Sequence, residues 1–153
     1  MPTPKEQLKT IRIIHFGLMA GPTFFAAVVA FLIISQGPAI DGSPVLNYLA
    51  PACFIVALLL YPLMFRNAVR KVKSENMELP EKMTTFQTGH VIRLAILEGA
   101  ALLSAVVALT NGAIYHLITV GLILALMFTK FPTPVLLESE LELTPEEKEQ
   151  LSS

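Results

Sequence analysis

Charged residues are scarce in this sequence. Of its 153 residues only 15% are Asp, Glu, Lys or Arg, whereas 54% are hydrophobic. A soluble domain usually carries about 25% charged residues. The shortfall falls in four apolar runs rather than along the whole chain, which is typical of a membrane protein. The net charge of −1 provides no overall field that favours nucleic acid as a partner.

Cysteine and the common catalytic motifs are also nearly absent. Cys53 is the single cysteine and lies inside an apolar run, which excludes a disulfide within one chain and a metal site built from several cysteines. The sequence has no glycine-rich phosphate loop, no His-Glu-x-x-His motif and no nucleophile elbow. Nothing favours a soluble catalytic domain, and we do not expect an enzyme.

The four apolar runs predict four transmembrane helices. The first run is longer than the roughly 7–15 apolar residues of a signal peptide and close to the ~20 needed to cross a bilayer. Ser43 followed by Pro44 is typical of a helix start, Pro80 can occupy a first turn, and Asn111-Gly112 predicts a tight turn. The predicted helices of this transmembrane domain, residues 1–130, cover about 9–35, 44–74, 80–110 and 113–130.

Residues 131–153 predict an acidic cytoplasmic tail. The sequence Phe-Pro-Thr-Pro at 131–134 breaks the fourth helix, and glutamates then greatly outnumber lysines. Thr144, Pro145 and Glu147 match a capping box with proline in the first turn, which predicts a short surface helix. We expect the acidic run itself to be solvated.

Lysine and arginine are distributed unevenly between the two ends of the predicted helices. Apart from Arg93, all of them lie before the first apolar run, in the segment 66–82, or after the fourth apolar run. The other two connections, 36–44 and 110–112, contain none. The positive-inside rule therefore predicts an all-α bundle of four transmembrane helices with both termini in the cytoplasm.

The third predicted helix carries ionisable residues within its apolar run. Glu98 and His90 fall in one stripe of the helical wheel, with Arg93 about 60° from His90. Because an intramembrane carboxyl group is costly, Glu98, with His90 and Arg93, is a candidate proton or ion relay. The alternative is a packed, neutral carboxyl group. For Arg93 we expect a lipid phosphate as partner, since a long side chain near a helix end reaches the interface.

The histidines permit a second hypothesis. His15 and His90 have a similar predicted depth on the cytoplasmic side and are candidate ligands of a b-type haem, with Arg12 and Arg93 near its propionates. The alternative is that both histidines are ordinary headgroup-level residues and that no cofactor is bound. His116 lies at the opposite end and cannot join the pair.

Small residues predict where helices approach one another. Gly17 and Gly21 have the GxxxG spacing that lets backbones come close, and Gly99 adds a small residue next to Glu98. These glycines indicate either packing within the bundle or association of two copies. Since several faces of the third helix carry small residues, we expect that helix to be central.

The third predicted helix resembles segments of two known protein families. The sequence H-V-I-R-L-A-I-L-E-G-A-A-L-L, the opening I-R-I-I-H-F-G-L-M-A-G and the ending K-F-P-T-P resemble an uncharacterised family of small bacterial four-helix membrane proteins. That resemblance implies the architecture and no activity. The segment around Glu98 also looks like the carboxylate helix of ATP synthase proteolipid subunit c, which implies a proton-carrying role for Glu98. The second helix lacks that family's glycine ridge, and the polar loop lacks its Arg-Gln-Pro signature.

Three functions follow as expectations for a multi-pass protein of the bacterial inner membrane. The first is a non-enzymatic assembly or interaction component whose partners are the lipid bilayer, other membrane proteins or a second copy. The second is a proton- or ion-coupled subunit that uses Glu98. The third is a haem- or quinone-binding subunit that uses His15 and His90.

Overall fold

The structure, a computed structural model, describes residues 3–36, 43–74 and 77–152. These residues form helices and no strand, which confirms the all-α prediction. The boundaries of the second and third helices lie within one residue of those expected. The six helices are α1 (Pro4–Gln36), α2 (Pro44–Ser74), α3 (Leu79–Asn111), α4 (His116–Thr129), α5 (Pro134–Leu141) and α6 (Pro145–Ser152).

Local chemistry defines several helix ends. Gly112 follows α3 with a left-handed φ of 62°, and its N–H donates to the carbonyl of Ala108, as expected for a glycine that ends a helix. The capping box of α6 is formed, because Thr144 N–H donates to Glu147 Oε2 at 2.8 Å. Thr133 caps α5 by accepting a hydrogen bond from the Leu136 N–H at 3.1 Å.

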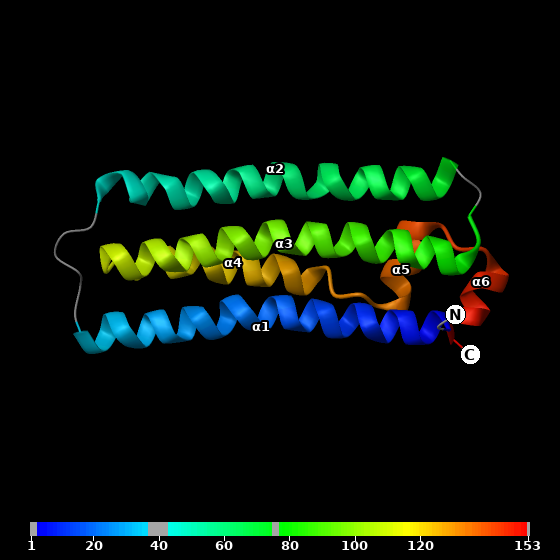
Figure 1. The fold of residues 1–153 in the computed structure, drawn as a ribbon, viewed down its shortest axis with the longest axis horizontal. Coiled ribbons are helices and arrows are strands. Elements are labelled where there is room, and N and C mark those ends of the chain that lie inside the picture. The colour runs from blue at the N-terminus through cyan, green and yellow to red at the C-terminus, as the bar shows by residue number, and fades with distance from the viewer. Residues whose placement is uncertain (1–2, 37–42, 75–76, 153) are drawn as a thin grey trace.

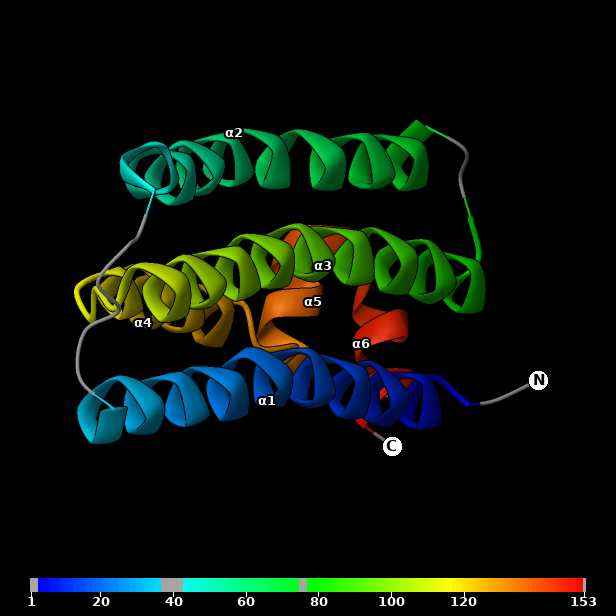
Figure 2. The ribbon, with the colours of Figure 1, turned by 60° about the vertical axis from the view of Figure 1, so that its left-hand side comes forward.

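The third helix is the centre of the fold. α1 and α2 run along opposite sides of α3, and α4 covers a third side (Figures 1 and 2). In the most apolar window of α3, 50% of residues are buried, against 17% in α1 and 18% in α2. Among the described residues, α1 and α2 have little direct contact, so one face of α3 is left open between them.

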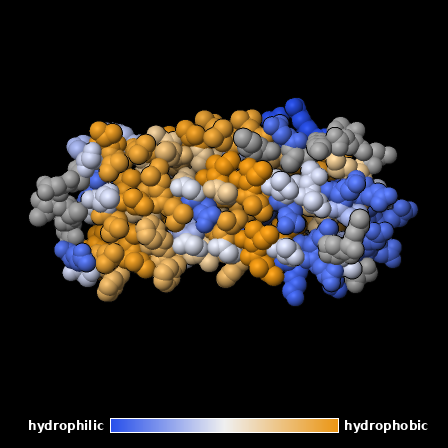
Figure 3. All heavy atoms as spheres, in the orientation of Figure 1, coloured by the Kyte–Doolittle hydropathy of each residue, from blue (hydrophilic) through white to orange (hydrophobic). Residues whose placement is uncertain are grey.

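Three helices are long and apolar enough to cross a membrane: α1, α2 as far as Asn67, and α3. α4 has 14 residues and at 1.5 Å per residue is about 21 Å long, which is less than the ~30 Å hydrocarbon core. It meets the requirement for a fourth span only together with α5, from which it is bent by 79°. Figure 3 shows an apolar surface over most of the long axis and a hydrophilic end. These features indicate a multi-pass membrane protein.

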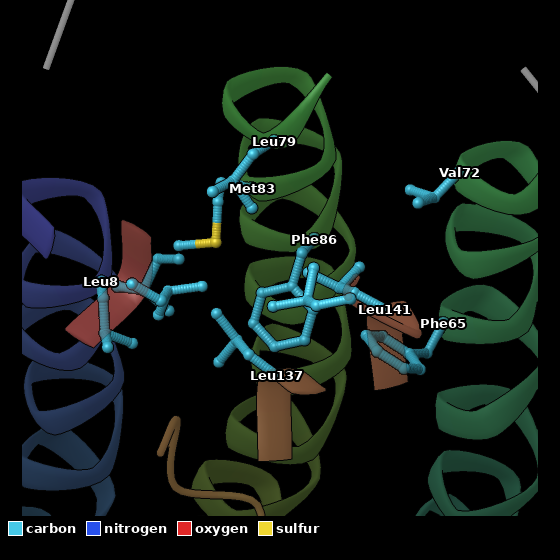
Figure 4. Close-up of a cluster of buried hydrophobic side chains, with 11 residues drawn as sticks. Leu8, Phe65, Val72, Leu79, Met83, Phe86, Leu137 and Leu141 are labelled. Atoms are coloured by element: carbon cyan, nitrogen blue, oxygen red, sulfur yellow. The ribbon is translucent and has the colours of Figure 1, made fainter. Parts of the chain in front are cut away.

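The C-terminal segment is packed on the bundle rather than solvated as expected. Leu137 and Leu141 of α5 are 0% and 2% exposed and lie in one cluster with Phe86 of α3 and Phe65 of α2 (Figure 4). Leu151 of α6 is also buried there. The tail prediction is wrong on this point because Leu137 and Leu141, one turn apart, give α5 an apolar face, and Leu151 adds a buried leucine from α6.

The opposite end of the bundle is closed by polar side chains. Asn47 Oδ1 in α2 accepts hydrogen bonds from Asn111 Nδ2 at 2.6 Å and from His116 Nε2 at 3.0 Å. These contacts join the start of α2, the end of α3 and the start of α4. His116 therefore lies far along the bundle from the other two histidines, as the sequence predicted.

Candidate functional site

His15 of α1 and His90 of α3 meet inside the bundle. Both side chains are fully buried, and Nδ1 of His15 lies 2.9 Å from Nε2 of His90. Nδ1 of His90 lies 2.6 Å from Nη2 of Arg93, whose Nη1 lies 3.3 Å from Oε1 of Glu140 in α5. The structure thus joins three residues singled out in the sequence with Glu140. We call this hydrogen-bonded set, His15, His90, Arg93 and Glu140, the histidine–arginine chain.

Because a guanidinium group only donates hydrogen bonds, Arg93 fixes the direction of hydrogen bonding in the histidine–arginine chain. Its Nη2 donates to Nδ1 of His90, so a neutral His90 carries its proton on Nε2. Nε2 of His90 then donates to Nδ1 of His15, whose own proton lies on Nε2. A proton added to Nδ1 of His90 would set two donors against each other, and would therefore displace Arg93.

Arg93 does not reach the lipid phosphates, so that prediction is wrong. The residue is 2% exposed, and its guanidinium lies 4.1 Å from the centre of the Phe65 ring of α2. Together with His90 and Glu140, this ring gives Arg93 partners on three helices. A buried cation requires such compensation, and here the C-terminal segment supplies the carboxylate.

Aromatic rings enclose the two histidines. Phe86, one turn before His90 on α3, stacks on its ring with centroids 5.3 Å apart and 19° between the planes. Phe131, at the break after α4, packs edge-on against His15 with centroids 5.1 Å apart. These apolar faces exclude water from both sides of the pair.

Several buried polar atoms in this enclosure have no hydrogen-bond partner in the described part of the chain. Such atoms are uncommon in folded proteins, yet three of the five found here belong to the histidine–arginine chain: Nε2 of His15, Nε of Arg93 and Oε2 of Glu140. The carbonyl of Met127 is near enough to interact with His15 without completing a hydrogen bond to Nε2. The histidine–arginine chain therefore has polar atoms without a hydrogen-bond partner at both of its ends, His15 and Glu140.

The predicted haem ligands are adjacent, but they contact each other. Two histidines that share one haem iron place their nitrogens about 4 Å apart, at roughly 2 Å per bond. The facing nitrogens are 2.9 Å apart here, and Arg12 donates from Nε to the carbonyl of Pro132 at 2.9 Å. No group of three His, Cys, Asp or Glu residues within the described ranges is placed to hold a metal ion. Haem binding stays a prediction that requires the two rings to separate.

Glu98 lies apart from the histidine–arginine chain. Its side chain is only partly buried, whereas we expected an enclosed carboxyl group. Its Oε1 is 3.2 Å from the position that a Cβ atom would take at Gly21 of α1. No hydrogen bond or ion pair to Glu98 is formed by the residues that the structure describes. The proposed relay of Glu98, His90 and Arg93 is thus joined only between its last two members.

The glycines differ in their surroundings. Gly21 is exposed, and the atom of α3 nearest to its Cβ position is Oε1 of Glu98, so the close approach of another backbone at Gly21 stays a prediction. A Cβ atom added at Gly17 or Gly99 would meet no other part of the described chain within 4 Å. Packing within the bundle at Gly17 and Gly99 is therefore not observed, and both glycines leave open surface next to the Glu98 region.

Glu140 is the functional candidate that the sequence reasoning missed. Thr133 followed by Pro134 is a cap with proline in the first turn, and Leu137 and Leu141 are one turn apart. These signals predict an amphipathic helix. They would have placed Glu140 beside its buried face. The sequence contains no signal that this helix docks on Arg93.

No family model, curated protein or solved structure matches this chain. The two resemblances noted in the sequence therefore stay predictions. Two features of the molecule remain from which function can be argued: the enclosed histidine–arginine chain and the open face around Glu98.

Proposed function

We propose that this chain is a four-span protein of the bacterial inner membrane that acts without catalysis, by binding a transmembrane helix of a partner protein. The observation that carries this proposal is Glu98. It is a carboxyl group midway along α3, partly exposed, and without a partner in the described residues. The partner helix supplies a hydrogen-bond donor or a basic side chain to it.

The energetics of a bilayer support a covered Glu98. A charged side chain at the centre of a membrane helix costs roughly 2.5–3.5 kcal/mol on insertion scales. An uncharged carboxyl group would still leave a hydrogen-bonding group in hydrocarbon. Beside Glu98, Ala95 and Gly99 are both exposed, and small residues let a second backbone approach closely. The face is thus suited to a helix that hydrogen-bonds to Glu98.

A partner of different sequence suits this face better than a second copy of the chain. In a two-fold dimer both subunits use the same patch, so Glu98 would face another Glu98 if it lay near the two-fold axis, and the apolar or small residues around it otherwise. Neither carboxyl group would meet a positive charge, and the flanking Ala95 and Gly99 add no side-chain donor. Charge complementarity therefore favours a partner that carries the cation or donor itself.

The proposed orientation places both termini in the cytoplasm. The N- and C-terminal ends lie at the same end of the bundle as the connection between α2 and α3 (Figure 1). This is also the hydrophilic end in Figure 3, and it carries Arg66 and Arg70 of α2 and Lys82 of α3. The positive-inside rule supports a cytoplasmic location for that end.

Photo-cross-linking in intact membranes tests the proposal. A photoreactive amino acid at Ala95, one turn from Glu98, should give one defined adduct with a membrane protein other than this chain. Glu98→Leu should lower its yield at least about fivefold, because an interhelical hydrogen bond in a membrane contributes about 1 kcal/mol. Glu98→Gln should retain the adduct, since it still hydrogen-bonds.

A matched pair of glycine variants separates contact from folding. Gly99→Leu adds a side chain to the open face and should abolish the adduct. Gly121→Leu on α4 is the control, because a Cβ atom at Gly121 also meets nothing within 4 Å. An adduct with twice the mass of the chain would show that the bound partner is a second copy of this protein. An adduct unaffected by Glu98→Leu would remove Glu98 from the interface and end the proposal.

A second candidate function is a proton-linked conformational change, favoured by the direction of hydrogen bonding in the histidine–arginine chain. A proton on Nδ1 of His90 displaces Arg93, and Arg93 in turn holds Glu140 of α5. The protection of residues 134–141 from hydrogen exchange, relative to the intrinsic exchange rates, should therefore fall as the pH is lowered, because a protonated His90 no longer accepts from Arg93. The pH dependence should disappear in His90→Gln. Equal behaviour of this variant and the unaltered chain would rule out the coupling.

A further inference from the structure

A cavity between α2 and α5 lies away from the open face around Glu98 and borders the histidine–arginine chain at Glu140. It has a volume of about 270 Å³ and is lined by Phe65, Arg66, Val69, Arg70 and Glu140. Figure 4 shows the Phe65 side chain directed from α2 toward Leu141 of α5. Pockets for drug-sized ligands measure about 300–1,000 Å³, so this one suits a smaller group.

The cavity has an excess of positive charge. Arg66 and Arg70 are one helical turn apart on α2, both are exposed, and neither has a hydrogen-bond or ion-pair partner among the described residues. The negative charge of Glu140 is offset by Arg93, with Nη1 and Oε1 3.3 Å apart. Two guanidinium groups therefore remain to attract an anion.

The sequence of α2 places the cavity at the expected depth of lipid phosphates, because the apolar span of this helix ends near Asn67. The apolar stretch of α2 ends at Phe65, and Arg66 is the next residue. The arginines thus begin where the hydrocarbon region of this helix ends, and Phe65 and Val69 supply an apolar wall beneath them. Basic pockets between membrane helices at the cytoplasmic boundary bind anionic headgroups.

The geometry points to a binding site for the phosphate of an anionic phospholipid in this cavity. The guanidinium groups of Arg66 and Arg70 would hold the phosphate oxygens in the paired geometry that arginine favours. The acyl chains would then lie along the apolar surface of α2. The site is independent of the partner face at Glu98, which belongs to α3 and α1.

Lipid titration of the purified protein, followed by native mass spectrometry, tests the site. Phosphatidylglycerol should bind the unaltered protein more tightly than zwitterionic phosphatidylethanolamine. The double variant Arg66→Gln, Arg70→Gln should weaken phosphatidylglycerol binding about 30-fold, on the scale of about fivefold for each interfacial arginine. The control is Lys9→Gln, Lys130→Gln, which makes the same change of charge outside the cavity and should alter the affinity less than about twofold.

Two further arms distinguish a site from a charged surface. Val69→Phe keeps both arginines but fills the cavity, and it should weaken phosphatidylglycerol binding at least about fivefold at an unchanged melting temperature. Inorganic phosphate alone should not raise the melting temperature of the protein. Equal affinity in the arginine and lysine double variants, or full binding in Val69→Phe, would overturn the site. If inorganic phosphate raised the melting temperature and phosphatidylglycerol did not, the proposal that a lipid occupies the cavity would be overturned.

Discussion

Replacing Glu140 by glutamine removes the negative charge beside Arg93 while keeping the shape of the side chain. Breaking a fully buried ion pair by removing one partner costs about 3–5 kcal/mol. Glu140 is 17% exposed, and Arg93 keeps His90 and Phe65 as partners. These two facts place the expected cost of Glu140→Gln lower, at about 2–3 kcal/mol of unfolding free energy.

Glu138 provides a matched control on the same helix. Its ion pair with Lys148 has an O–N distance of 3.2 Å, but the side chains are 36% and 45% exposed. Exposed pairs contribute about 0–1 kcal/mol. Because a chain of this length shifts its melting temperature by about 2–4 °C per kcal/mol, Glu140→Gln should melt roughly 5–10 °C lower. Glu138→Gln should melt less than about 4 °C lower.

Thermal unfolding in detergent, followed by far-ultraviolet circular dichroism, measures both variants. Thiol labelling at Leu141→Cys, in a Cys53→Ala background, reports the docking of α5, since Leu141 is 2% exposed. Adding Glu140→Gln should accelerate this labelling, and adding Glu138→Gln should not. Equal melting temperatures and equal labelling rates for the two glutamine variants would refute the role of Glu140 as the buried counter-ion of Arg93.

Three further predictions concern the membrane, Glu98 and the C-terminal helix. In a cysteine-free background, a cysteine placed at Ser43 should react with an impermeant thiol reagent in intact cells, whereas one at Thr3 should not; the reverse would invert the orientation. Glu98→Gln should express like the unaltered chain, whereas Glu98→Lys should express poorly because a central cation costs roughly 2.5–3.5 kcal/mol; equal expression would place Glu98 in water. Partial burial opposes ionisation of Glu147, but hydrogen bonds from Lys82 and Thr144 outweigh it and hold its pKa below the ordinary value of a glutamate. Its contribution is therefore present above that value and lost as the pH falls through the lowered pKa, so the protection of α6 amides from hydrogen exchange, relative to intrinsic rates, should persist at pH 5 and fall only in stronger acid.

The limits of α2 and α3 were predictable because they depend on residues next to each other in the sequence. Ser43 with Pro44 starts α2, and Gly112 ends α3 through its left-handed backbone. The position of α4 was also indicated, although it begins later than expected, at His116. Such signals act within one turn and need no knowledge of the tertiary fold.

The partners of Arg93 and Glu98 were not predictable for a different reason. Helical periodicity tells which residues share a face, but in a helix that is apolar all round it does not tell which face is covered. Arg93 turned out to lie under α5, 47 residues further along the chain at Glu140. Glu98 turned out to face the opening between α1 and α2. Both outcomes depend on how helices pack, and so does the meeting of His15 with His90.

The short α4 gives this molecule two different hydrophobic lengths on its flanks. Along α1 and α2 a lipid meets helices that extend beyond the whole hydrocarbon layer. Along α4 it meets about 21 Å of helix and then a bend of 79°. Hydrophobic mismatch of this kind is accommodated by local thinning of the bilayer or by tilting. The membrane is therefore expected to be thinner on the α4 side, which would favour neighbours with short spans there and proteins with full-length helices on the other flanks.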